Sequence, residues 1–200
     1  MDPRLLGAAR SGSLEDFKIL ADIEPDILRN RSIQENTALH IAARFGHTKL
    51  VEEIIKRNPS LVLSTNLKGE TPVHNASRAG HENIVSIFID SVKDFNNIYI
   101  ARLRDISGNT PLHGAVKNKH STVVWALARQ DLQSLELVND AGESPLSIAI
   151  DLRYVGIADD IIDLNPRTLN FKSLKGRTAL HYAVLRRDIS KDFHFPNDYF

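Results

Sequence analysis

The apolar residues of the chain recur in pairs one helical turn apart. The clearest example is Leu50-Val51 followed by Ile54-Ile55. This spacing forms one face of an amphipathic helix, and such a face must be buried against a neighbouring element. The same spacing predicts three more helices, with the apolar faces Ile84-Val85-Phe88-Ile89, Val123-Val124-Leu127-Ala128 and Ile157-Ala158-Ile161-Ile162.

A shorter, alanine-rich helix is predicted before each of these faces. The segment from His40 to Phe45 (HIAARF) is typical. A Thr or Ser before each such segment suits the N-cap, because its side-chain oxygen can accept a hydrogen bond from a free backbone N–H group. Proline suits the first helical position, and glycine suits the position after the last one. These residues are Pro72, Pro111 and Pro145 at the starts and Gly12, Gly46 and Gly80 at the ends.

The two helices belong to a unit that repeats along the chain. Tetrapeptides ending at positions 40, 74, 113, 147 and 181 read TALH, TPVH, TPLH, SPLS and TALH, with spacings of 34, 39, 34 and 34 residues. Four of these units carry a glycine five residues before the last position, where a tight turn needs a positive φ. These glycines are Gly69, Gly108, Gly142 and Gly176.

The repeat spacing predicts one domain of six units and a short tail. The domain covers residues 1–188, with repeats at about 2–31, 32–65, 66–104, 105–138, 139–172 and an incomplete 173–188, and the tail is 189–200. The 39-residue step places five extra residues around 92–104. Because the faces of each helix pair can be buried only against neighbouring units, the pattern predicts an all-α solenoid.

The repeated unit resembles the ankyrin repeat. The T-P-L-H-x-A pattern, the 34-residue step, the Gly-His after the first helix and the turn glycine all match that family over residues 2 to about 188. The resemblance implies stacked helix-turn-helix units with short β-turn fingers. It also implies a concave surface that binds protein partners, and no cofactor.

A closer resemblance is to plant ankyrin proteins of the accelerated-cell-death type. The segments NTALHIAARFGH, GETPVHNASRAGH and KGRTALHYAV are similar to their successive repeats. Members act in defence and stress signalling and usually have more repeats and a C-terminal membrane domain. The resemblance implies a cytoplasmic adaptor in such signalling. The alternative is a soluble regulatory fragment of a larger, membrane-anchored protein, located on the cytoplasmic side of a membrane.

Composition narrows the remaining classes of function. The 25 Lys and Arg residues balance 25 Asp and Glu residues, which does not favour a nucleic-acid partner. The absence of cysteine excludes disulfides, thiol nucleophiles and thiolate zinc sites. The most apolar stretch, 84–89, has six residues, whereas a bilayer span needs about 20. We therefore expect no direct membrane insertion by this chain.

The histidines are the main candidates for chemistry. His40, His74, His113 and His181 recur at the repeat period, whereas metal ligation needs imidazoles that converge on one point. We expect these rings to bond the turn backbone and connect consecutive loops, with no metal bound. Nucleotide-binding, zinc-protease and serine-hydrolase motifs are absent from the sequence, so an enzyme is the least favoured alternative.

The ankyrin pattern implies which positions line the concave surface. Arg44, Arg78 and Lys117 share one column and predict a positive stripe, with Phe45 beside it as an aromatic anchor. We expect a partner with an acidic segment, and we expect charge reversal at Arg44 and Arg78 to change stability by no more than about 0.5 kcal/mol. The full set of expected partner-binding residues is Arg44, Phe45, Leu67, Lys68, Glu70, Arg78, Ile106, Asn109, Lys117, Asn118, Asp140 and Glu143.

Two further expectations concern packing. Trp125, the only tryptophan, falls in an otherwise polar column, so it is either covered locally or contacts a partner. Local cover by Phe95, Ile98, Tyr99 and Ile100 of the insertion is the preferred interpretation. The last unit lacks a second apolar face, so we expect Ile157, Ile161 and Ile162 to be only partly covered. This predicts a monomer that tends to self-associate at its C-terminal end.

Overall fold

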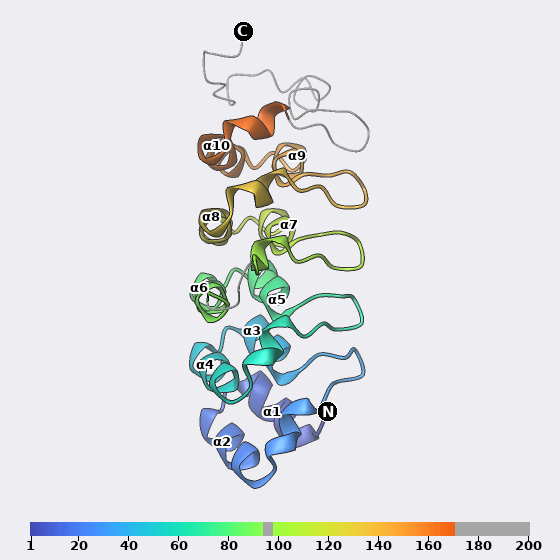
Figure 1. Ribbon diagram of the computed structural model, residues 1–200, viewed down its shortest axis with the longest axis vertical. Helices are drawn as coiled ribbons and strands as arrows, with labels where there is room; N and C mark the ends of the chain where they lie inside the picture. The colour runs from blue at the N-terminus through green and yellow to red at the C-terminus, as the bar shows by residue number, and fades with distance from the viewer. Residues whose placement is uncertain (94–97, 171–200) are drawn as a thin grey trace.

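The computed structural model describes residues 1–93 and 98–170, which form a single stack of helical units (Figure 1). Each unit contains an inner helix, an outer helix and a short 3-10 helix. The inner helices are α1 (Pro3–Ser11), α3 (Ala38–Phe45), α5 (Pro72–Ala79), α7 (Pro111–Lys117) and α9 (Pro145–Asp151). The outer helices are α2 (Leu14–Ile23), α4 (Thr48–Arg57), α6 (Glu82–Ser91), α8 (Ser121–Gln130) and α10 (Val155–Leu164). The 3-10 helices are η1 (Pro25–Arg29), η2 (Pro59–Leu63), η3 (Ile100–Arg102), η4 (Leu132–Glu136) and η5 (Pro166–Asn170).

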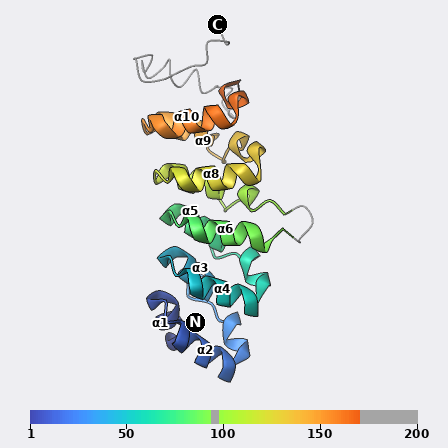
Figure 2. The ribbon, with the colours of Figure 1, turned by 90° about the vertical axis from the view of Figure 1, so that its left-hand side faces the viewer.

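The stack is an all-α solenoid, as predicted. Inner helices contact inner helices and outer helices contact outer helices of the adjacent units, so the core runs the length of the stack (Figure 2). The apolar faces expected from the sequence are buried, including Leu50, Val51 and Ile54 of α4. Ile55 and Ile89, at the edge of their faces, are half-buried. In the described ranges the chain forms no strand, and no helix is both long and apolar enough to cross a bilayer.

The helix ends follow the predicted capping residues. Thr37 and His40 form a reciprocal capping box, in which the Thr37 side chain accepts from the His40 N–H and the His40 ring accepts from the Thr37 N–H. The α5 and α7 helices begin in the same way. At the other end, Gly46 has a φ of 83° and closes α3 in the left-handed conformation, and Gly12 and Gly80 do the same for α1 and α5.

A β-turn finger precedes each inner helix after the first and projects to the side away from the outer helices (Figure 1). Asn66 and Gly69 close one such turn through a 2.9 Å bond between the Gly69 N–H and the Asn66 carbonyl. Gly69, Gly108 and Gly142 all have a positive φ, as the sequence predicts, while Gly176 lies outside the described residues. Successive fingers are bonded to each other, because Leu67 donates to the Gln34 carbonyl at 3.1 Å and Ile106 to the Lys68 carbonyl at 2.9 Å.

The sequence predicted that three isoleucines at the C-terminal edge of the stack are only partly covered, and this prediction is wrong. Ile157, Ile161 and Ile162 are all buried. They belong to α10, which contacts α9, η5 and α8, and the contact with η5 is one that the pattern of apolar pairs does not reveal. The incomplete sixth repeat with His181 and the tail of residues 189–200 lie outside the described residues.

Candidate protein-interaction surface

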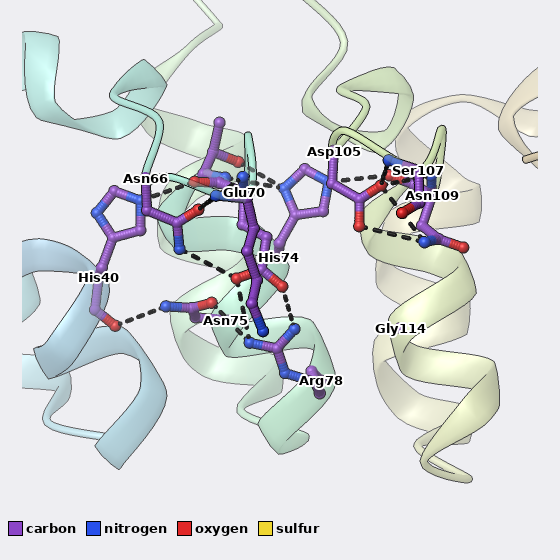
Figure 3. Close-up of polar contacts among 12 residues, drawn as sticks. His40, Asn66, Glu70, His74, Asn75, Arg78, Asp105, Ser107, Asn109 and Gly114 are labelled. Atoms are coloured by element: carbon purple, nitrogen blue, oxygen red, sulfur yellow. Dashed lines mark hydrogen bonds and ion pairs between the residues drawn. The ribbon is translucent and has the colours of Figure 1, made fainter. Parts of the chain in front are cut away.

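The repeat histidines connect consecutive units along the inner side of the fingers. The Nδ1 atom of each ring accepts from the backbone N–H of its own N-cap threonine, at 3.1 to 3.2 Å. This assigns the proton to Nε2, which donates to a carbonyl in the next finger. The acceptors are the carbonyls of Glu70 for His40 at 2.9 Å and Asn109 for His74 at 3.2 Å (Figure 3). The acceptor for His113 is the Glu143 carbonyl at 3.0 Å. The expected hydrogen bonds between these rings and the turn backbone are present.

Burial keeps these three rings neutral. Desolvation lowers the pKa of His40 and of His113 to about 4, and it also lowers the pKa of His74. Both nitrogens of each ring are used in hydrogen bonds, so neither is available to a ligand. Among residues 1–93 and 98–170, no three His, Asp or Glu side chains are grouped as a metal ion would require.

Asparagine and glutamate side chains bridge the bases of the fingers. The Asn66 amide donates to Asn36 Oδ1 at 2.9 Å and to Glu70 Oε2 at 3.0 Å, while its Oδ1 accepts from the Lys68 and Glu70 N–H groups. The same arrangement recurs two fingers later, where Asn139 donates to Asn109 and Glu143 at 2.9 Å. These contacts hold the fingers parallel and fix the direction of the side chains at their tips.

Glu70 was predicted to be an accessible partner-binding residue, and the structure corrects this prediction. Its side chain belongs to a polar cluster with Arg78 and Asn75 and is only 6% exposed (Figure 3). Burial disfavours ionisation of Glu70, but hydrogen bonds from Arg78 and Asn66 outweigh this, so its pKa lies below the ordinary value. Glu70 is therefore a structural partner of Arg78 and not an accessible contact.

The prediction of a continuous positive stripe is also wrong. Arg78 is paired with Glu70, and Lys117 lies 3.3 Å from Glu143. Arg44 makes no ion pair within the described part of the chain, and its guanidinium lies 5.9 Å from the centre of the Phe45 ring. The uncompensated charge is thus concentrated at the N-terminal end of the column, where the exposed Arg10 occupies the equivalent position one repeat earlier.

The other predicted positions differ in accessibility. Phe45, Leu67 and Ile106 are exposed apolar residues, and Lys68, Asn118 and Asp140 are exposed polar ones. Asn109 and Glu143 are half-buried and engaged in the bonds between fingers. Ile33 and Arg10 were not predicted from the sequence, although each lies 34 residues before a predicted position, Leu67 and Arg44 respectively.

Trp125 lies on the outer side of the stack. It is half-buried in a pocket of about 400 Å³ between α6 and α8, with Ser86 and Ile89 opposite, and the Arg129 guanidinium lies 5.4 Å from its ring. The residues that line this pocket belong to α6 and α8. Of the residues expected to cover it, Ile98 and Tyr99 line the adjoining pocket, Ile100 is fully buried in the core and Phe95 lies outside the described residues.

The fold is that of a solenoid repeat protein, because helix pairs stack in series and their fingers are bonded to each other. Proteins of this class bind partners on an extended surface. A family model described as ankyrin repeats (3 copies) matches residues 5–99 and 56–134, which is more than half of the chain. The chain belongs to the ankyrin-repeat family.

Two curated relatives share this similarity. The chain is 28% identical over 205 residues to Protein ACCELERATED CELL DEATH 6 of Arabidopsis thaliana, covering 93% of this chain and 31% of that protein. It is 29% identical over 86 residues to Rabankyrin-5 of Mus musculus, covering 43% of this chain and 7% of that protein. The chain therefore spans less than a third of the length of either relative.

Proposed function

We propose that this chain is a non-enzymatic protein-interaction scaffold that acts in plant defence or stress signalling. Ankyrin repeats form protein–protein interaction scaffolds, and the similarity to Protein ACCELERATED CELL DEATH 6 over 93% of the chain supports the biological setting. The proposed location is the cytoplasm, which fractionation of the tissue of origin with an antibody to this chain would test.

One observation carries the choice of binding surface. Arg44 has no acidic partner in the described part of the chain and lies beside Phe45, whose side chain is 48% exposed. A cation and an aromatic ring left accessible on a rigid helix are the residue types enriched at binding hot spots. The proposed partner presents a carboxylate to Arg44 and Arg10 and an apolar group to Phe45.

Affinity capture tests this proposal. The intact chain would be used to capture proteins from its own tissue, in parallel with the variants Arg10→Glu/Arg44→Glu and Phe45→Ala. Lys49→Glu/Lys56→Glu is the matched control, because it reverses two exposed charges on the outer helix α4. We expect mass spectrometry to show partners that are retained by the parent and the control and lost with the other two variants. Retention of all partners by all variants would place the binding surface elsewhere, and Trp125 would be the next residue to change.

A second candidate function is that of a regulatory part of a longer, membrane-anchored protein. The observation that favours it is that the matched region is 31% of the length of the Arabidopsis relative. Sequencing the full transcript would separate the two candidates. A downstream run of about 20 apolar residues in frame would favour the longer protein, whereas a stop codon directly after position 200 would favour the adaptor.

A further inference from the structure

The tips of three consecutive fingers carry exposed apolar side chains. Ile33, Leu67 and Ile106 each occupy the second position of a β-turn closed by a bond of 2.8 to 3.0 Å, and their exposed fractions are 91%, 64% and 70%. We call these three residues the apolar ridge. Exposed apolar groups at one repeated position, on a rigid support, indicate a surface that is covered by a partner.

The fingers hold the ridge in one line. Leu67 donates to the finger that carries Ile33, and Ile106 donates to the finger that carries Leu67, so neighbouring tips are bonded directly. Ile106 approaches Gly69 closely. A Cβ added to Gly69 would lie 3.1 Å from Ile106 Cγ2, which is closer than an ordinary contact, so the absence of a side chain allows this approach. Ile106 is thereby held close to the preceding finger tip. At the fourth tip the apolar residue is replaced by the exposed Asp140.

The unpaired charge near the N-terminal end of the ridge is positive, because Glu35, the acid in the turn that carries Ile33, lies 3.8 Å from Arg31. The finger bases carry Asn36, Glu70, Asn109 and Glu143 in turn, and the two glutamates pair with Arg78 and Lys117. Because Asn36 is neutral and Glu70 is taken by Arg78, the described residues provide no acid for Arg10 or Arg44. Lys68, beside Leu67 in the same turn, is also exposed and makes no ion pair within these ranges. A carboxylate-bearing partner is therefore complementary to the first three units, and Asp140 repels it at the fifth.

The spacing of the ridge selects the conformation of the partner. Packed helical units are about 8 to 10 Å apart, and the ridge has one residue per unit. A polyproline II helix rises about 3.1 Å per residue with three residues per turn, so it presents every third side chain in line at about 9 Å intervals. A β-strand presents every second side chain at intervals of about 6.6 Å and does not match.

We propose that the apolar ridge binds a partner segment in polyproline II conformation, with an apolar residue at every third position and carboxylates between them. The apolar side chains contact Ile33, Leu67 and Ile106, and the carboxylates lie toward Arg44, Arg10 and Lys68. This inference rests on the proposed protein-binding function and specifies the chemistry of the partner.

The probe is a fluorescein-labelled peptide of three Leu-Glu-Pro repeats, titrated with the full chain and followed by fluorescence anisotropy. We expect saturable binding that is weakened at least ~10-fold when the ridge is changed by Ile33→Ser/Leu67→Ser/Ile106→Ser, and similarly by Arg10→Glu/Arg44→Glu. The charge-dependent part is expected to weaken further in 0.5 M salt. Ile19→Ser/Ile23→Ser, which changes two exposed isoleucines of the outer helix α2, is the matched control and should bind as the parent does.

Two altered peptides test the spacing and the charge. Three Leu-Glu-Ser-Pro repeats shift the leucines to every fourth residue, and three Leu-Lys-Pro repeats reverse the charge; both should bind at least ~10-fold more weakly. No saturable binding of the first peptide, equal binding of either altered peptide, or unchanged binding by the ridge variant would overturn the proposal. Captured partners that still depend on Arg10 and Arg44 would in that case show that the proposed function holds without this partner chemistry.

Discussion

At the scale of single residues, the stability of the stack depends on polar groups that are buried and fully bonded. His74 illustrates this, because its ring accepts from Thr71 and donates to Asn109 in the next unit. We expect His74→Ala to lower the free energy of unfolding by about 1–3 kcal/mol, since it leaves buried backbone groups without partners. His81→Ala removes an exposed bond to the Arg44 carbonyl and should cost less. Urea denaturation with and without zinc checks both, and a zinc-dependent rise in stability of the parent would contradict a purely structural role.

The buried histidines also make stability depend on pH. His40 and His113 have a folded-state pKa of about 4, below the ordinary value of 6.5, so the unfolded chain binds protons first as the pH falls. Their contribution is complete above pH 6.5 and is lost progressively toward pH 4, by roughly 3 kcal/mol for each ring. The window between pH 6.5 and 5 lies above the ordinary pKa values of Asp and Glu side chains, so the slope of denaturation midpoints in this window reports chiefly the histidines. His113→Gln should reduce the slope; a parent with no slope there would contradict the assignment.

Ser77 is a buried residue that costs stability. It is fully buried in α5, and its hydroxyl has no hydrogen-bond partner in the described part of the structure. The equivalent residue one repeat earlier is Ala43. Since an unpaired buried hydroxyl is unfavourable, we expect Ser77→Ala to raise the free energy of unfolding by about 1 kcal/mol. Chemical denaturation measures this change, and a loss of stability would show that the hydroxyl is bonded in solution.

At the scale of helices, the glycine that ends an inner helix and the histidine of the next unit form a matched pair. A Cβ on Gly46 would lie 2.7 Å from the His81 ring, and Gly12 and Gly80 face His47 and His120 in the same way. In the fourth and fifth units the left-handed position is taken by Lys119 and Arg153. The histidine of the fifth unit that would face Lys119 is replaced by Tyr154, over whose ring the Lys119 ammonium lies at 5.4 Å.

This pairing predicts a coupling energy. Gly46→Ala should cost about 1–2 kcal/mol for the left-handed conformation and more for the collision with His81. In the background His81→Ala the collision is removed, so the same change should cost less. A double-mutant cycle measured by urea denaturation compares the two costs, and strictly additive effects would exclude the collision.

At the scale of the whole molecule, the repeat period was sufficient to predict the solenoid. The apolar faces, the capping threonines and the direction of the His40 ring all follow from residues within one unit and its neighbour. The candidate surface was predicted less well because it depends on which acid pairs with which cation. Glu70 lies between the positions of Arg44 and Arg78, and nothing in the one-dimensional pattern shows that Arg78 takes it. The sequence pattern also did not show that α6 lies against Trp125, whereas the predicted cover by Phe95 lies outside the described residues.

The bonds of the buried histidines His40, His74 and His113 all run from one unit to the finger of the next, whereas the more exposed His47, His81 and His120 bond back to the preceding unit. The effect of shortening the stack on the buried bonds therefore depends on which end is removed. A proteolytic fragment that ended between the second and third units would leave the His40 ring without its acceptor, whereas one that began there would keep His74 and His113 intact. The series is interrupted at the fifth unit, where Ser147 replaces the histidine and donates to the carbonyl of Ser144 in its own unit. Among the described residues, a cut just after η5 therefore leaves no buried histidine without its acceptor, which makes that junction a suitable place to shorten the molecule.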